Sequence, residues 1–447
     1  MLNKEFIKAS MVRKFNSNPT YAKMYEWGKL VTITGVAQII VQLAGLICGI
    51  MIIRFLSPKE YGLYTLVNTM LGTMAIIADG GIVTGVMAEG GKVWEDRKKL
   101  GVVISTGLDL RKIFGIVSLA VAIPPLLYLL LNHGATWLMS VLIILSLIPA
   151  FFASMSDTML EVAPKLKQDI KALQKNQLQA SIGRLALTGI TIFIFPWAFI
   201  AILAGGLPRI WANIFLKKIS VDYADLSQKP EVKVKKQILS FVKRIMPGAI
   251  YYSISGQITI WLISIFGTTS SIAQIGALGR LTMVLSIVST LFTSLIVPRF
   301  AKLPEIRQLL FKRYIAIILI LFSVISIIVG ICWLFPDQIL WILGKSYSGL
   351  SKEFLFVVVA ACLNLIAGIS FSLNSNRGWI FNPIIGIGIG LTEIFLGIML
   401  FNISTLQGVL YFNLFQASVG LLLHPSFGMF KILKLSKYGR EQAKISS

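Results

Sequence analysis

Residues 54–64 read RFLSPKEYGLY, and they separate two long apolar runs, VTITGVAQIIVQLAGLICGIMII before them and TLVNTMLGTMAIIA after them. A proline, a lysine and a glutamate are confined to this short stretch. If each flanking run is a helix in a membrane, Ser57, Pro58, Lys59 and Glu60 form the turn between them, because proline ends a helix and the charges hold the turn in water. The stretch therefore predicts a transmembrane helical hairpin.

The composition extends this prediction to the whole chain. Its 447 residues are 56% hydrophobic and 14% charged, with a mean hydropathy of +0.79, whereas a soluble protein is roughly 45–50% apolar and about 25% charged. Apolar runs near 20 residues long are sufficient to cross a hydrocarbon core about 30 Å thick. Twelve such runs lie near 31–53, 61–88, 113–131, 136–156, 178–195, 197–216, 245–266, 271–297, 314–335, 353–373, 380–401 and 407–423. We therefore predict an all-α polytopic membrane protein with about 12 transmembrane helices.

The basic residues predict the orientation of these helices. Placing both termini in the cytoplasm puts 35 of the 42 Lys and Arg residues in the termini and the even-numbered connections, as the positive-inside rule requires. The net charge of +23 then reflects loops that face anionic lipid, and we expect membrane lipids and no nucleic acid as partners.

The most charged connection divides the chain into two halves of six predicted spans each. We expect a cytoplasmic amphipathic segment at 1–30, an N-lobe at 31–216, a basic cytoplasmic linker at 217–244, a C-lobe at 245–423 and a basic cytoplasmic tail at 424–447. Two such halves that meet at a site near the membrane midplane are a common plan for transporters.

Residues suited to catalysis or metal binding are few. The histidines are His133 and His424, and the three cysteines lie inside apolar runs at spacings that match no metal site. The longest connection on the outer side, near 336–352, has Asp337 as its one acid, which disfavours a membrane glycan polymerase. We therefore expect that the protein is not an enzyme and that it binds no metal or cofactor.

Several predicted spans carry polar or small residues at helical spacing. Such a stripe either lines a wet cavity or packs helix against helix, and the sequence leaves both open. The stripes are Thr34, Gln38, Gln42, Gly45 and Gly49; Thr65, Asn68, Gly72, Ala75 and Asp79; Ser181, Arg184, Thr188 and Thr191; Gly248, Tyr252, Ser255 and Thr259; and Asn382, Gly386, Gly390 and Glu393.

Two segments resemble a known family. Residues 54–91, RFLSPKEYGLYTLVNTMLGTMAIIADGGIVTGVMAEGG, are similar to the opening of the Wzx-type oligosaccharide flippases, and residues 275–303, IGALGRLTMVLSIVSTLFTSLIVPRFAKL, are similar to the eighth span of that family. The family belongs to the multidrug, oligosaccharidyl-lipid and polysaccharide (MOP) exporter superfamily. The chain departs from many relatives at 86–88, where they carry an arginine, and at Gln257, where they carry an aspartate.

The resemblance implies two six-helix lobes around a central cavity, as in MATE and other MOP transporters, in the cytoplasmic membrane of a bacterium. It also implies a substrate, an oligosaccharide on a polyprenyl diphosphate. The protein would move it from the cytoplasmic to the outer leaflet by alternating access, for surface polysaccharides of the O-antigen or capsule type. A polysaccharide polymerase and its chain-length machinery would be further partners.

Cations inside the spans are the candidates for binding the diphosphate. Arg184 is the first choice because it lies on a polar stripe, and Arg280 matches a family position. Asp79 and Glu393 are the acids well within spans, and we expect them to pair with arginines or to bind a coupling cation, H⁺ or Na⁺. Polar stripe residues predicted to bind the sugar or the diphosphate are Gln38, Gln42, Asn68, Thr188, Tyr252 and Ser255.

Two other transporters remain as alternatives. A cation-coupled multidrug antiporter of the MATE type shares the architecture but would be expected to hold deep carboxylates, where the first span offers glutamines. A flippase for lipid II-type peptidoglycan precursors usually has two further helices, which this length hardly accommodates.

Overall fold

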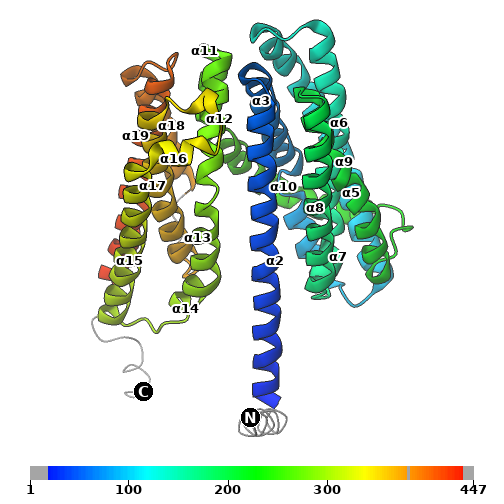
Figure 1. Cartoon of the computed structure of the whole chain (residues 1–447). Coiled ribbons are helices and arrows are strands. Elements are labelled where there is room, and N and C mark those ends of the chain that lie inside the picture. Colours follow the sequence, from blue (N-terminus) through cyan, green and yellow to red (C-terminus); the bar gives the residue numbers. More distant parts are fainter. Residues whose placement is uncertain (1–18, 380–382, 436–447) are drawn as a thin grey trace, which may run out of the picture.

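The computed structural model describes residues 19–379 and 383–435, and within this part of the chain every regular element is a helix (Figure 1). The all-α prediction is thus confirmed. In the first half the helices are α2 (Pro19–Phe55), α3 (Pro58–Asp79), α4 (Ile82–Lys92), α5 (Arg97–Asn132), α6 (Trp137–Leu160), α7 (Val162–Leu166), α8 (Ile170–Ile194) and α9 (Ala198–Tyr223). In the second half they are α10 (Val232–Ser255), α11 (Ile258–Phe266), α12 (Thr269–Thr282), α13 (Leu285–Leu291), η1 (Phe292–Ile296), α14 (Val297–Ala301), α15 (Arg307–Leu334), α16 (Pro336–Trp341), η2 (Lys345–Tyr347), α17 (Ser351–Ser375), α18 (Pro383–Leu400) and α19 (Leu406–Leu433).

The long helices correspond to the apolar runs of the sequence. Eight of the described helices are long and apolar enough to cross a membrane, and the bent pairs α10–α11 and α12–α13 bring the number to ten. The more polar α8 and the shorter α18 occupy the two remaining runs. Large side chains on the outside, such as Val121 and Phe193, are about 70% exposed (70% and 73%), as expected where lipid rather than water covers the surface. The chain is a multi-pass membrane protein.

The stretch at 54–64 forms the predicted hairpin between α2 and α3. Ser57 caps α3 by accepting a hydrogen bond from the backbone N–H of Glu60 at 3.3 Å, and Pro58 occupies the first helical position, where no N–H is required. The Glu60 carboxylate reaches across to accept the N–H of Ala198, the first residue of α9, at 2.8 Å. Tyr61 is buried in the largest apolar cluster. The turn therefore fixes α2, α3 and α9 to one another.

The helices form two bundles that stand side by side, with α2 between them in the view of Figure 1. The N-terminal bundle is built on the packing of α6 with α9, of α8 with α9 and of α2 with α8, and the C-terminal bundle on that of α15 and α17 with α19. The two meet chiefly where α3 packs against α12. We call the end at which α2 begins and α19 finishes the basic end, because most of the lysines and arginines lie there, and the end with the α2–α3 turn the opposite end.

Helix α10 belongs to both bundles. Ile238, Ile245 and Met246 contact the glycines at 80, 81 and 85 of the α3–α4 region. After a bend of 57°, α11 continues against α12 and α19 in the C-terminal bundle. The chain thus crosses between bundles within one bent helix pair.

The segment expected to be a linker, 217–244, is mostly helical. α9 runs to Tyr223 and α10 begins at Val232, which leaves 224–231 as the connection. This short loop is anchored, because the N–H of Asp225 donates to the Arg97 carbonyl at 2.9 Å. The side chains of Ser227 and Gln228 donate to the Asp225 carboxylate, each at 2.6 Å, and hold its pKa below its usual value.

The bounds of other expected segments also differ from the sequence prediction. The run at 61–88 is two helices, because Gly80 and Gly81 adopt left-handed backbone angles (φ 47° and 95°) between α3 and α4. The last 12 residues of the expected N-terminal segment, 19–30, are the start of α2, and the tail begins only after α19 ends at Leu433. Residues 1–18 and 436–447 lie outside the described residues.

Candidate binding cavities between and within the bundles

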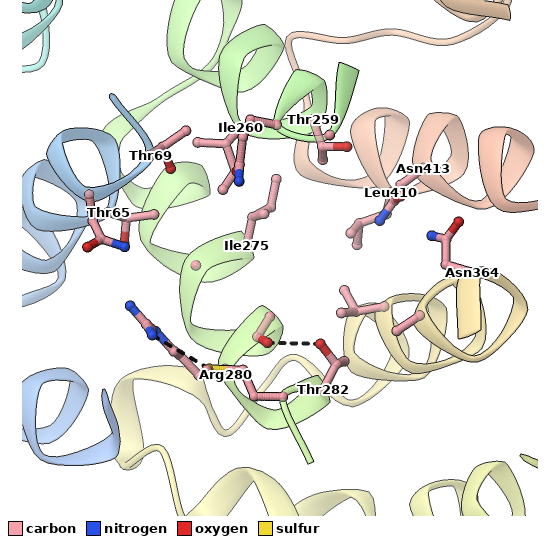
Figure 2. A pocket seen from close by; sticks show the side chains of 18 of the residues that line it. Thr65, Thr69, Thr259, Ile260, Ile275, Arg280, Thr282, Asn364, Leu410 and Asn413 are labelled. Atoms are coloured by element: carbon pink, nitrogen blue, oxygen red, sulfur yellow. Dashed lines mark hydrogen bonds between the residues drawn. The ribbon is translucent and has the colours of Figure 1, made fainter. Parts of the chain in front are cut away.

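A polar cavity of about 420 Å³ lies where the two bundles meet (Figure 2). We call it the central cavity. One wall is α3, and the others come from the α10–α11 bend, α12, α17 and α19. Its polar lining consists of Tyr61, Thr65, Asn68, Thr69, Gln257, Thr259, Arg280, Thr282, Asn364 and Asn413.

A larger cavity of about 1050 Å³ adjoins it inside the C-terminal bundle, between α10, α17, α18 and α19. We call it the C-terminal cavity. Gly256, Thr259, Asn364 and Asn413 line both cavities, so the two adjoin along these residues. The wall of the C-terminal cavity combines polar groups with isoleucines of α18.

Breaks in two helices place backbone beside the central cavity. α10 ends at Ser255 and α11 begins at Ile258, and α12 ends at Thr282 with a bend of 40° into α13. Gly256, Gln257 and Met283, at or next to these breaks, line the cavity. Interrupted helices are tolerated at membrane depth where a water-filled cavity satisfies the freed backbone groups. The cavity therefore explains how these two helix pairs can be interrupted within the membrane.

Arg280 is the cation of the central cavity. It lies on the last turn of α12, its guanidinium is beside the hydroxyl of Tyr61, and Nη1 is 3.6 Å from the sulfur of Met283. Its side chain fits against Gly49 of α2, where a Cβ would lie 3.2 Å from Cδ of the arginine. Among the described residues no carboxylate lies within ion-pair distance of it. Figure 2 shows it at one side of the cavity, with Asn364 and Asn413 at the other.

The predicted site residues divide into two groups. Asn68 and Arg280 line the central cavity, and Ser255 and Glu393 line the C-terminal cavity. The stripe residues Gly248, Thr259, Gly386 and Gly390 also line the C-terminal cavity, and Gly390 packs closely against Tyr251 of α10 as well. The side chain of Tyr252 and the whole of Asn382 lie outside the described residues.

The other predicted residues contact neighbouring helices and line neither cavity. Gln42 accepts a hydrogen bond from Ser286 of α13, which joins the two bundles. Gln38 donates to Gln177 of α8 at 3.3 Å, and Thr188 is fully buried. Arg184 lies against Gly205 of α9, 3.7 Å from the position a Cβ would take there. In this conformation α8 packs its polar stripe against the helices beside it.

Asp79 forms an ion pair with an arginine that the sequence analysis did not single out. Its carboxylate is 2.9 Å from Arg111 on α5, whose other nitrogen donates to the Met155 carbonyl and to Thr158. Asp79 therefore pairs with an arginine, as expected, and its partner in this conformation is Arg111 rather than Arg184 or Arg280. Arg111 precedes the apolar run at 113–131 in the sequence, yet it is 5% exposed inside the N-terminal bundle.

Two further charged residues within the spans are Arg209 and Glu393. Arg209 pairs with Asp157 of α6 at 3.0 Å. Glu393 is half-buried on α18, and no ion pair joins it to any described residue. It is the one acid among the described residues that line the two cavities.

Three carboxamides on the cavity walls are not among the predicted site residues, and Gln257 was noted only as a departure from the family. The three are Asn364, Asn413 and Gln416. A signal for the last two was present, because Asn413, Gln416, Gly420 and His424 recur at helical spacing on α19. Asn364 stands alone in an apolar stretch of α17 and carries no such signal.

Hydrogen bonds at the opposite end join the bundles. His133, 6% exposed at the end of α5, contacts the Ser264 carbonyl through Nε2 at 2.7 Å and the Thr269 hydroxyl through Nδ1 at 3.0 Å. Arg54 donates to the carbonyls of Trp341 and Ile342 at 2.7 and 2.8 Å. These bonds hold the bundles together at the end with the α2–α3 turn.

We expect Thr269→Val to favour opening at that end. A neutral hydrogen bond contributes about 1 kcal/mol. Losing the bond between Thr269 and His133 would therefore raise the ratio of open to closed molecules roughly fivefold. Spin labels at the exposed positions Lys59 and Ser346, on the two bundles, would report this as a larger share of long distances in pulsed electron resonance. Thr136→Val, which removes a helix cap within one bundle, is the matched control. An unchanged distance distribution in Thr269→Val would contradict the prediction.

Comparisons with known proteins identify the fold. No protein-family model and no curated protein matches the chain, but solved structures do. A multidrug resistance MATE family transporter of the MOP superfamily in its inward-facing conformation aligns with a TM-score of 0.70 at 16% identity, over 88% of this chain and 94% of that chain. An outward-facing conformation of such a transporter gives 0.59 at 16% identity, over 92% and 96%.

A third similar structure is a MOP superfamily transporter from Pyrococcus furiosus, described as having a binding pocket of reverse polarity that suggests a different function. It gives a TM-score of 0.57 at 15% identity, over 90% of this chain and 94% of that chain. Identities this low establish the fold alone. The chain has the polytopic fold of the MATE and MOP transporters, which confirms the predicted fold class.

Proposed function

We propose that this chain, with the fold of the MOP transporters, is a flippase for oligosaccharides linked to polyprenyl diphosphate. It moves its substrate from the cytoplasmic to the outer leaflet of a bacterial cytoplasmic membrane by alternating access, for the synthesis of a surface polysaccharide. The observation that supports this most is the lining of the two cavities. It contains two arginines, Arg280 and Arg244, and one acid, Glu393, and the rest of the polar lining is neutral.

This lining suits an anionic headgroup with many hydroxyls. A guanidinium can bind a diphosphate through two parallel hydrogen bonds. Each sugar hydroxyl moved into hydrocarbon without a partner costs about 4–8 kcal/mol on the water-to-cyclohexane scale, and amides and hydroxyls on the wall replace the lost bonds with water. The polyprenyl tail remains in lipid throughout.

The charge distribution supports the membrane orientation that this direction of transport requires. The positive-inside rule places the basic end in the cytoplasm, so both termini are cytoplasmic and the cavities receive substrate from the leaflet where it is assembled. Release at the outer side requires the bonds of His133 and Arg54 to open. A polymerase with its chain-length machinery would then use the product.

Two features bear on energy coupling and on the alternative function. Asp79 is engaged with Arg111, so Glu393 is the better candidate for binding a coupling H⁺ or Na⁺. A multidrug antiporter would share the fold, but two arginines against one acid disfavour a cationic drug in these cavities.

The leaflet in which the lipid-linked oligosaccharide resides tests the proposal. In cells depleted of the protein, a membrane-impermeant oxidant of vicinal hydroxyls should leave the accumulated oligosaccharide intact, and surface polysaccharide should fall. Re-expression of the wild-type chain should restore reaction with the oxidant. If completed units still reach the outer leaflet of depleted cells, the proposed function is wrong.

A further inference from the structure

One wall of the C-terminal cavity carries polar side chains without a hydrogen-bond or ion-pair partner among the described residues. The amides of Asn364, Asn413 and Gln416 and the carboxylate of Glu393 form no hydrogen bond or ion pair with any described residue. They come from three helices, α17, α19 and α18, and they all line this cavity. In this respect they differ from Asn374 and Arg377 of the same bundle.

Two polar side chains of the C-terminal bundle that lie outside the cavity show the contrast, because they bond to backbone carbonyls. Asn374 of α17 donates to the His424 carbonyl at 2.9 Å, and Arg377 donates to the carbonyls of Phe300 and Leu303 at 2.9 and 3.0 Å. At membrane depth an unbonded amide or carboxylate is costly unless water or a ligand supplies the missing bonds. The cavity wall thus retains donors and acceptors for something that enters it.

The chemistry of the wall indicates hydroxyl-bearing rings. An amide offers one acceptor and two donors, and a carboxylate accepts two hydrogen bonds side by side, which matches neighbouring hydroxyls. Isoleucines at 384, 387 and 389 of α18 provide apolar surface for the faces of the rings. The volume of about 1050 Å³ is at the upper limit of roughly 300–1,000 Å³ typical for drug-sized ligands.

We propose that the C-terminal cavity binds the glycan of the transported lipid, with Glu393, Asn413 and Gln416 bonding to its hydroxyls. This inference rests on the proposed function. Asn364 and Asn413 line both cavities, so a headgroup with its diphosphate at Arg280 can extend its sugars past them into the C-terminal bundle. The sugars beyond the first then decide how tightly a given lipid binds.

Equilibrium binding to the purified full-length chain in detergent tests this. The probes are the lipid-linked oligosaccharide extracted from depleted cells and undecaprenyl diphosphate, which has the diphosphate and no sugar. We expect the oligosaccharide lipid to bind at least tenfold more tightly to the wild type. The double variant Glu393→Gln, Gln416→Ala should lose about tenfold in affinity for it and keep its affinity for undecaprenyl diphosphate.

Controls separate this inference from the proposed function. Gln407 is an exposed glutamine in the first turn of α19, and the variant Gln407→Ala should bind both probes as the wild type does. If the double variant unfolds, Gln416→Glu keeps the shape and removes the donors. Unchanged affinity of either variant for the oligosaccharide lipid, or equal weakening for both probes, would refute the glycan site. A wild-type chain that binds neither probe would refute the proposed function itself.

Discussion

Arg280→Ala is expected to reduce translocation of the lipid-linked oligosaccharide roughly 150-fold. Removing one partner of a buried, hydrogen-bonded charge pair costs about 2–5 kcal/mol, and 3 kcal/mol corresponds to that factor. The loss should be large because the central cavity offers the diphosphate no second arginine among the residues that line it; Arg244 lies in the adjoining cavity. Arg280→Lys should recover part of the rate, since an ammonium keeps the charge but loses the planar fork.

The measurement is the transport rate of reconstituted protein at equal insertion, followed by accessibility of the oligosaccharide to an impermeant reagent. Arg184→Ala is the most informative comparison, because the sequence pointed to Arg184 first, whereas the structure sets it against Gly205 of α9. We expect a change of less than about threefold for it. If Arg184→Ala abolished transport and Arg280→Ala left it intact, the assignment of the diphosphate to the central cavity would be wrong.

Asp79→Asn should lower the free energy of unfolding by about 3–5 kcal/mol, which is the usual cost of leaving one charge of a buried pair unpaired. The side chain of Arg111 is 7% exposed and that of Asp79 is 29% exposed, so water cannot replace the carboxylate fully. Unfolding in mixed micelles with increasing anionic detergent would measure the change.

Two further variants separate loss of the pair from loss of a polar residue. The double variant Asp79→Leu, Arg111→Met should recover most of the stability, because no unpaired charge remains. Asp157→Asn breaks the pair with Arg209, whose side chain is 51% exposed, and should cost about 1 kcal/mol or less. Equal losses of unfolding free energy for Asp79→Asn and Asp157→Asn would contradict the prediction, because the buried pair would then stabilise the fold no more than the exposed one.

Much of the fold could be predicted from hydropathy because crossing lipid imposes a length and a composition that are visible in the sequence. The positions of the spans follow from this rule, and so does the hairpin at Ser57 and Pro58. Helix ends do not follow, since α5 begins at Arg97, well before its apolar run. A helix that continues into water keeps its hydrogen bonds while its hydropathy falls.

The candidate site was only partly predictable, because a stripe on one helix does not say what faces it. Gln42 and Asn68 belong to similar stripes, yet Gln42 bonds to Ser286 on another helix and Asn68 faces open space in the central cavity. The polar stripe favours Arg184 over Arg280, yet Arg280 lines the central cavity and Arg184 does not. The bend after Thr282 ends α12 next to Arg280 and places the residue on the cavity wall.

The bent pair α10–α11 has a consequence for the way the protein moves. Helix α10 packs on α4, and α11 packs on α12 and α19. The two bundles are therefore linked by one helix pair that bends between Ser255 and Ile258. Any rotation of one bundle relative to the other must change the bend between α10 and α11, which lies beside both cavities. A substrate bound there would therefore act on the bend directly, and Gly256→Ala, which makes the bend less flexible, should slow the cycle. Loading and motion would be coupled mechanically, with no relay of side chains between distant sites.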